Sequence, residues 1–69
     1  MKISARNILK GKIVDVVKGA TTAHVKIDVN GTIVTATITN DSVDGLKLKK
    51  DLMAYAVIKA SDVMVAIDD

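Results

Sequence analysis

The sequence predicts an all-β fold built from five short strands and one helical turn, within one domain that spans residues 1–69. Two observations lead to this prediction. Apolar residues alternate with polar ones over several short runs, which is the pattern of strands with one buried face. Glycine-containing turns separate these runs, and one of them is an Asn-Gly pair, the strongest short-range signal of a β-hairpin. A chain of 69 residues is also too short for a second domain.

The first predicted strand runs from Ile8 to Val17 and is rich in isoleucine and valine. Gly11 interrupts it, and a glycine inside a strand indicates a bend or a bulge, as at the corner of a barrel. Residues 18–20, with the sequence Lys-Gly-Ala, then form a turn.

The next two predicted strands form a hairpin around Asn30 and Gly31, which both tolerate the positive φ angles of a type I′ turn. Apolar and polar residues alternate from Thr22 to Val29. A two-residue turn sets the register and places apolar residues opposite one another on one face. The predicted pairs are Val29–Thr32, Ile27–Val34, Val25–Ala36 and Ala23–Ile38 on that face, with His24–Thr37 and Lys26–Thr35 on the other.

Residues 40–45 break the strand pattern and predict the helical turn. Asn40 or Asp41 is expected to cap it, and Gly45 to end it in a left-handed conformation.

The strand predicted from Leu52 to Lys59 has apolar residues on both faces. A strand of an antiparallel sheet in a small monomer usually has one face in water. We therefore expect the second face of this strand to meet another subunit. Val63 to Ile67 is predicted as the fifth and last strand.

Together these elements predict an OB-like Greek-key barrel. A chain this short buries only about 60% of its unfolded surface on folding, although 49% of its residues are apolar. A core shared between several chains would bury the excess, so we expect an oligomer. A monomeric small barrel with an ordinary exposed apolar surface is the alternative.

Composition limits the chemistry. The chain has no cysteine and one histidine, which excludes thiolate metal sites and Cys–His catalytic pairs. No apolar run approaches the about 20 residues of a membrane span, and the N-terminus lacks the long apolar stretch of a signal peptide. These observations predict a non-enzymatic, cytoplasmic protein with no organic cofactor and no site for a metal cation.

Two short polar runs near opposite ends of the chain carry the candidate binding chemistry. The first is Ile3-Ser4-Ala5-Arg6-Asn7 and the second is Lys59-Ala60-Ser61-Asp62-Val63. They offer hydroxyl, guanidinium, amide and ammonium donors, and the first run has no carboxylate, so it suits an anion rather than a metal cation. Asp62 in the second run would repel an oxyanion, and we expect it to have a capping or structural role. If the fold brings them together, within one chain or between chains, Arg6 and Lys59 supply two positive charges to a doubly charged tetrahedral oxyanion.

The same runs lie in motifs that resemble those of the molbindins, small cytoplasmic molybdate- and tungstate-binding proteins of the TOBE-domain family. The motifs are S-A-R-N-I-L-K-G at residues 4–11, I-T-N-D-S at residues 38–42 and I-K-A-S-D-V-M at residues 58–64. The resemblance implies intracellular storage or buffering of molybdate or tungstate, and a hexamer built as a trimer of dimers with anion sites between subunits. It adds Ser42, from the middle motif, to the candidate ligands. The full set is Ser4, Ala5, Arg6, Asn7, Ser42, Lys59, Ala60 and Ser61.

A single-stranded nucleic-acid-binding module is the alternative function, because OB-like barrels commonly bind single strands. Such binding relies on aromatic side chains, with each stacked base contributing about 1–3 kcal/mol. Tyr55 is the only aromatic residue and the net charge is +2, so no nucleic-acid partner is expected.

His24 is predicted to be an exposed strand residue, with a second anion site at a subunit junction as its functional alternative.

Overall fold

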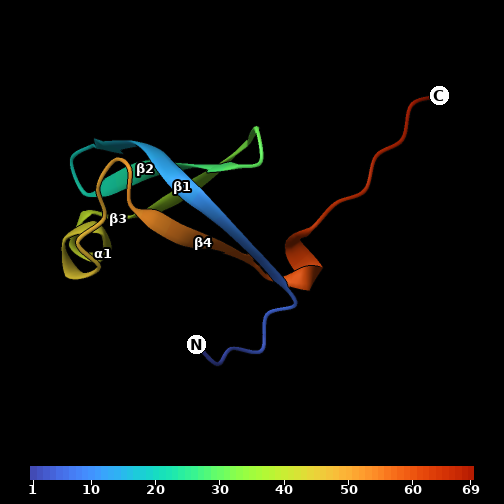
Figure 1. The fold of residues 1–69 in the computed structure, drawn as a ribbon, viewed down its shortest axis with the longest axis horizontal. Helices are drawn as coiled ribbons and strands as arrows, with labels where there is room; N and C mark the ends of the chain where they lie inside the picture. Colours follow the sequence, from blue (N-terminus) through green and yellow to red (C-terminus); the bar gives the residue numbers. More distant parts are fainter.

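The computed structural model describes all residues, 1–69, and contains a single antiparallel sheet with one short α-helix and one 3-10 turn. In chain order the elements are β1 (Asn7–Lys18), β2 (Thr22–Val29), β3 (Thr32–Thr39), α1 (Asn40–Gly45), β4 (Met53–Ile58) and η1 (Ala60–Asp62). The strand order across the sheet is β3-β2-β1-β4 (Figure 1). The predicted all-β class with one helical turn is confirmed, but the sheet has four strands and is not closed.

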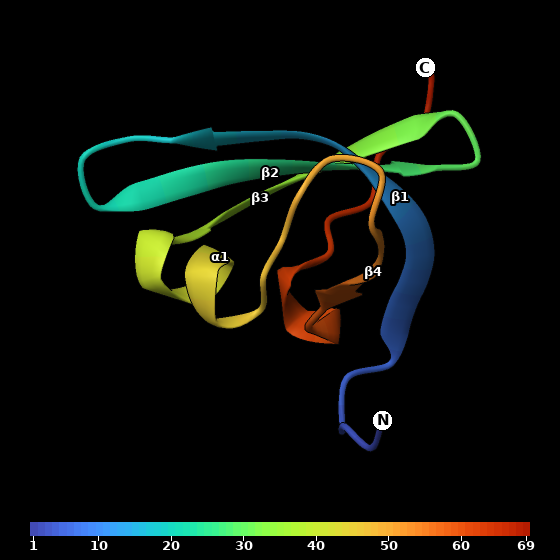
Figure 2. The same ribbon diagram turned by 60° about the vertical axis from the view of Figure 1, so that its left-hand side comes forward.

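β1 is the long strand that joins the two halves of the sheet. Its first half pairs with β4 and its second half with β2, and the strand curves strongly between them (Figure 2). A Cβ atom at Gly11 would lie 2.5 Å from the backbone oxygen of Asp28, so only glycine allows β1 and β2 to approach this closely. The register irregularity lies between Ile13 and Asp15. Gly11 therefore allows β1 and β2 to lie close together, and the bulge lies between Ile13 and Asp15 rather than at Gly11.

The hairpin of β2 and β3 follows the prediction in full. Asn30 and Gly31 have φ angles of 51° and 91°, as a type I′ turn requires. The Asp28 carboxylate accepts a hydrogen bond from the Gly31 N–H at 2.8 Å. All six predicted cross-strand pairs are present.

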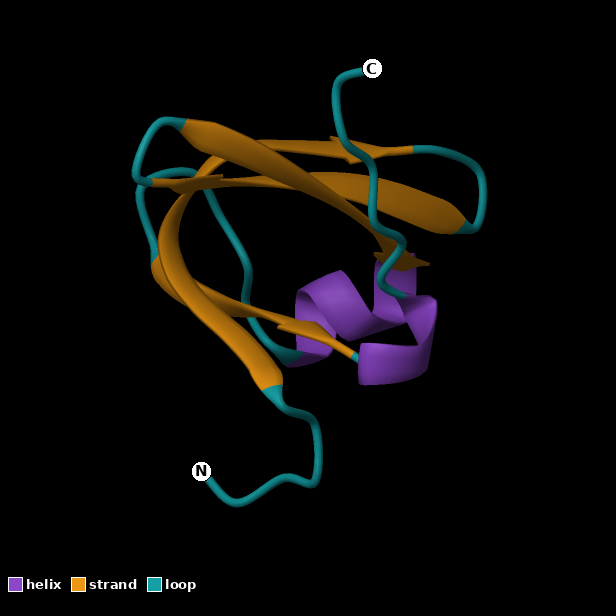
Figure 3. Cartoon of the chain, turned by 90° about the vertical axis from the view of Figure 1, so that its right-hand side faces the viewer, coloured by secondary structure: helices purple, strands orange, loops and turns teal.

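The core lies on the concave side of the curved sheet, where α1 packs against it (Figure 3). Its buried apolar residues are Ile13, Ala23, Val25, Ile27, Val43 and Ala56. The helix is capped by Thr39, and not by Asn40 or Asp41, because the extended backbone of Thr39 lets its Oγ1 accept from the Ser42 N–H at 3.0 Å. Gly45 does not take the predicted left-handed conformation; Lys47 does, with φ 54°.

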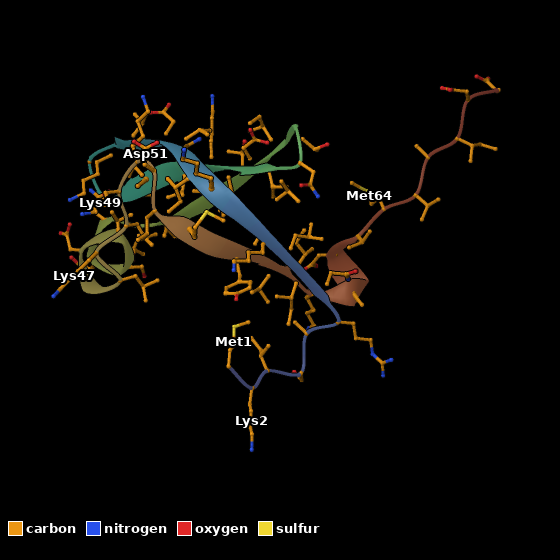
Figure 4. All side chains as sticks on the ribbon, in the orientation of Figure 1. Met1, Lys2, Lys47, Lys49, Asp51 and Met64 are labelled. Carbon is orange, nitrogen blue, oxygen red and sulfur yellow. The ribbon has the colours of Figure 1, made fainter.

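The last predicted strand does not pair with any other strand of the chain. Residues 63–67, here called the C-terminal arm, leave η1 in an extended direction and project from the body of the molecule (Figures 1 and 4). Met64, Val65 and Ile67 are 93%, 89% and 87% exposed. The accessible surface of 5568 Å² accordingly exceeds the about 4,200 Å² expected for a compact monomer of this mass.

No helix in the chain has the length and apolar character needed to cross a membrane.

Candidate anion-binding site

The two polar runs meet at one end of the sheet. β1 and β4 are antiparallel neighbours, and Asn7 at the start of β1 pairs with Ile58 at the end of β4. The Asn7 side-chain amide also donates to the Ile58 carbonyl at 3.3 Å. The residues before β1 and those after β4 therefore leave the sheet side by side, and the two runs converge within one chain.

A cavity of about 500 Å³ lies between them. It is lined by Ile3, Ser4, Ala5, Arg6, Val57, Lys59, Ala60 and Ser61. The lining holds two cations and two hydroxyls and contains no carboxylate and no imidazole. These groups are suited to bind an oxyanion through charge and hydrogen-bond donation.

The donors at this cavity have no partner within the chain. The ion pairs of the structure are Lys12–Asp51 and Lys18–Asp44, so Arg6 and Lys59 take part in none. The Ser4 and Ser61 hydroxyls form no hydrogen bond to another group of the chain. An anion that enters the cavity would therefore not have to displace an existing ion pair.

The 3-10 turn η1 shapes the second half of the site. The Asp62 N–H donates to the Lys59 carbonyl at 2.9 Å, and the Val63 N–H donates to the Ala60 carbonyl at 3.3 Å. This turn keeps Lys59 and Ser61 at the cavity. Asp62 is not among the lining residues, so the only carboxylate of the run lies outside the cavity.

Two of the candidate ligands lie outside the cavity. Asn7 holds β1 to the end of β4 through its bond to Ile58. Ser42 lies in the first turn of α1, where its N–H donates to Thr39 Oγ1 and its own Oγ accepts from Thr39 Oγ1 at 2.8 Å. Figure 1 shows α1 near the opposite end of β4 from η1. Within one chain, the I-T-N-D-S motif is thus the start of a helix and not part of the cavity.

Sequence reasoning missed two apolar residues of the lining, Ile3 and Val57. Val57 could have been found from its place in β4, because alternation puts it on the face opposite the buried Ala56. Ile3 carries no signal beyond its position next to Ser4.

His24 lies on the polar face of the hairpin opposite Thr37, as predicted, and its side chain is exposed. No group of three or more His, Cys, Asp or Glu side chains is arranged to hold a metal ion.

Comparison with known proteins places the chain in a family. The TOBE domain model matches residues 3–65. The probable molybdenum-pterin-binding protein of Haemophilus influenzae is 45% identical over 69 residues, covering 99% of this chain and 100% of that protein. The solved structure of a molybdate-binding protein from Sporomusa ovata superposes with a TM-score of 0.93 at 39% identity, covering 97% of this chain and 100% of that one.

A second similar structure is that of the cytoplasmic molybdate-binding protein ModG, solved with molybdate bound. Its TM-score is 0.88 at 42% identity, and the match covers 93% of this chain and 46% of that chain. The fold, the family model and the full-length identity agree with one another and with the three sequence motifs. The chain therefore belongs to the TOBE-domain family, and its relatives there are molybdate- and molybdenum-pterin-binding proteins.

Proposed function

We propose that this protein binds molybdate as its cargo, at the cavity between the Ser4–Arg6 and Lys59–Ser61 runs. One observation carries the proposal: two unpaired cations and two free hydroxyls line a single cavity that contains no carboxylate. The names of its relatives support molybdate as the anion. Membership of a family of binding proteins supports a non-catalytic role.

The physical mechanism is charge neutralisation with directed hydrogen bonds. Arg6 and Lys59 offset the −2 charge, while Ser4, Ser61 and backbone amides near Ala5 and Ala60 donate to the oxygens. Each charge-assisted hydrogen bond contributes about 1.5–3 kcal/mol net. Several of them reach the about 8 kcal/mol of micromolar affinity after the costs of association.

Tungstate should bind at the same site, because it has the same charge and tetrahedral shape. We propose storage or buffering of these anions in the cytoplasm as the role of the protein, which the absence of cysteine and the cytoplasmic relative ModG support.

We further propose that the protein works as an oligomer, with a hexamer built as a trimer of dimers as the expected form. The outward face of β4 supports this, because Met53, Tyr55 and Val57 are 55%, 49% and 40% exposed although all are apolar or aromatic. The donors that line the cavity, Ser4, Arg6, Lys59 and Ser61, are all exposed in the single chain. This open lining supports a site that a second subunit completes.

Binding of single-stranded nucleic acid remains the competing function, and Tyr55 is its only stacking residue. One aromatic contributes about 1–3 kcal/mol of stacking, which is small against the about 8 kcal/mol of micromolar affinity.

Calorimetric titration of the full chain with molybdate, tungstate, sulfate and a short single-stranded oligonucleotide tests the proposal. Molybdate and tungstate should bind with similar affinity and the oligonucleotide should give no heat. Arg6→Ala and Lys59→Ala should each weaken molybdate binding at least tenfold without unfolding the protein. Lys49→Ala is the matched control, since it removes an exposed lysine away from the cavity and should leave the affinity unchanged.

Unchanged titration in either cavity variant would remove that residue from the site. Absence of molybdate heat in the parent chain, or oligonucleotide binding at micromolar concentration, would overturn the proposed function.

A further inference from the structure

Asp62 places a carboxylate directly after a residue of the anion cavity, and the structure gives this carboxylate no partner. It follows Ser61 and is the last residue of η1. The capping role expected for Asp62 is wrong, because Lys59 is the residue that precedes the turn and no side chain caps it. The Asp62 carboxylate also takes part in no ion pair and no hydrogen bond.

Other acids of the chain show which contacts an aspartate makes in this fold. Asp28 accepts a hydrogen bond from a backbone N–H in the hairpin turn, and Asp44 and Asp51 each pair with a lysine. Asp62 is exposed and makes neither kind of contact. No contact within the chain therefore explains an acid at this position.

Asp62 is nevertheless held close to the cavity. Its N–H donates to the Lys59 carbonyl at 2.9 Å, and this bond closes the turn that carries Ser61. Consecutive Cα atoms are about 3.8 Å apart, and a hydrogen bond from the Ser61 hydroxyl to an anion adds about 3 Å. The Asp62 carboxylate thus lies within about 10 Å of an anion bound at Ser61, although it is not among the residues that line the cavity.

At this distance Asp62 changes the charge balance of the site. Arg6 and Lys59 supply two positive charges to the cavity, and the carboxylate of Asp62 cancels one of them for an anion that approaches. Coulomb repulsion across about 10 Å of water weakens the binding of a dianion about fourfold and that of a monoanion about twofold. The energy is proportional to the charge of the anion, so the factor for the dianion is the square of the factor for the monoanion.

We propose that Asp62 lowers the affinity of the cavity for dianions by charge repulsion, and that this keeps molybdate binding reversible. The inference rests on the proposed function, because a protein that buffers an anion has to release it when its free concentration falls. Asp62 acts here without touching the anion, through its charge and its fixed place in η1. It is a determinant of affinity and of charge selectivity, and not a ligand.

Calorimetric titration of the full chain with tungstate and perrhenate, at about 10 mM and about 500 mM sodium chloride, tests the proposal. These anions are isoelectronic tetrahedra of nearly the same size, with charges of −2 and −1. Asp62→Asn removes the negative charge with little change of shape. At low salt it should bind tungstate about fourfold more tightly than the parent, and perrhenate, measured by competition with tungstate, about twofold more tightly. At high salt, where the Debye length is about 4 Å, both gains should disappear.

Asp41→Asn is the matched control, because it makes the same change in net charge far from the cavity. Asp41 is exposed and lies in α1, near the opposite end of β4 from η1 (Figure 1). This variant should bind both anions like the parent. Asp62→Glu keeps the charge and should retain the parent's ratio of tungstate to perrhenate affinity. Sedimentation velocity should give the same mass for the parent and all three variants, so that a gain in affinity is not an effect of assembly.

Tungstate affinity in Asp62→Asn that equals that of the parent would overturn the proposal. A loss of affinity or a changed mass would also overturn it, since Asp62 would then be needed for the shape of η1 or for assembly. Equal gains for the two anions, or a gain that persists at high salt, would show an effect of shape and not of charge. The same gain in Asp41→Asn would assign the effect to the net charge of the whole chain.

These results differ from a failure of the proposed function. A parent chain that gives no heat with tungstate or molybdate would overturn that function and this inference with it. The outcomes above leave oxyanion binding in place and remove only the role of Asp62.

Discussion

Replacement of Gly11 by alanine should destabilise the protein through a clash that can be located atom by atom. The new Cβ would lie 2.5 Å from the Asp28 carbonyl oxygen and 2.7 Å from the Ile27 Cγ2. Ordinary carbon–oxygen contacts are about 3.3 Å or longer, so β1 and β2 would have to separate by about 0.8 Å. Ile27 is 5% exposed and belongs to the core, and it has little space to move away.

The cost of such overpacking is about 1–3 kcal/mol. About 0.4–1 kcal/mol of this cost is offset because alanine lowers the conformational entropy of the unfolded chain relative to glycine. The mid-range values leave a net loss of about 1.3 kcal/mol, which for a domain of this size corresponds to a fall in Tm of roughly 5–10 °C. Circular dichroism melting at equal protein concentration measures it, and the concentration must match because assembly would raise Tm.

Gly45→Ala is the control for this experiment. No atom lies within 4 Å of a Cβ built there, and Gly45 has no positive φ. Its Tm should stay the same or rise slightly. A Gly11→Ala protein that melts within about 2 °C of the parent would refute the close-approach argument, since even 1 kcal/mol shifts Tm by roughly 4–8 °C in a domain of this size.

Three further substitutions test local features. Thr39→Ala removes the cap of α1 and should lower the free energy of unfolding by about 1 kcal/mol, measured by urea denaturation. Ser42→Ala should leave the calorimetric molybdate affinity within twofold of the parent, since Ser42 does not line the cavity; a tenfold loss would make it a ligand. Asp44→Asn breaks the exposed pair with Lys18 and should cost less than about 1 kcal/mol. High salt should abolish that difference, and a larger or salt-independent effect would show that Asp44 does more than pair with Lys18.

The hairpin could be predicted down to its register because everything that determines it is local. Asn30 and Gly31 specify the turn, and the apolar alternation on either side specifies which face is buried. The cap of α1 depends on finer detail. Thr39, Asn40 and Asp41 are all of residue types that commonly cap helices. Thr39 caps α1 because it is the last residue of β3 and its backbone is still extended.

The meeting of the two polar runs is a long-range event that periodicity does not encode. Asn7 and Ile58 are 51 positions apart and become neighbours only because β1 and β4 pair. The matching chemistry of the two runs predicted their convergence, but it did not separate residues that line the cavity from those beside it. Asn7 is a candidate for its amide donors and Ser42 for its place in the motif at residues 38–42, but such groups also clamp strands and take part in helix caps.

The C-terminal arm shows what an alternating pattern does and does not determine. The alternating pattern identifies apolar side chains whose removal from water is favourable. The hydrophobic effect is non-directional, so it does not specify which surface covers them. It acts equally whether the covering surface belongs to the same chain or to another. The backbone bonds of a strand edge are likewise the same within and between chains. The choice depends on the connection, and here residues 60–62 form a 3-10 turn from which the chain leaves extended at Val63, with φ −89° and ψ 123°.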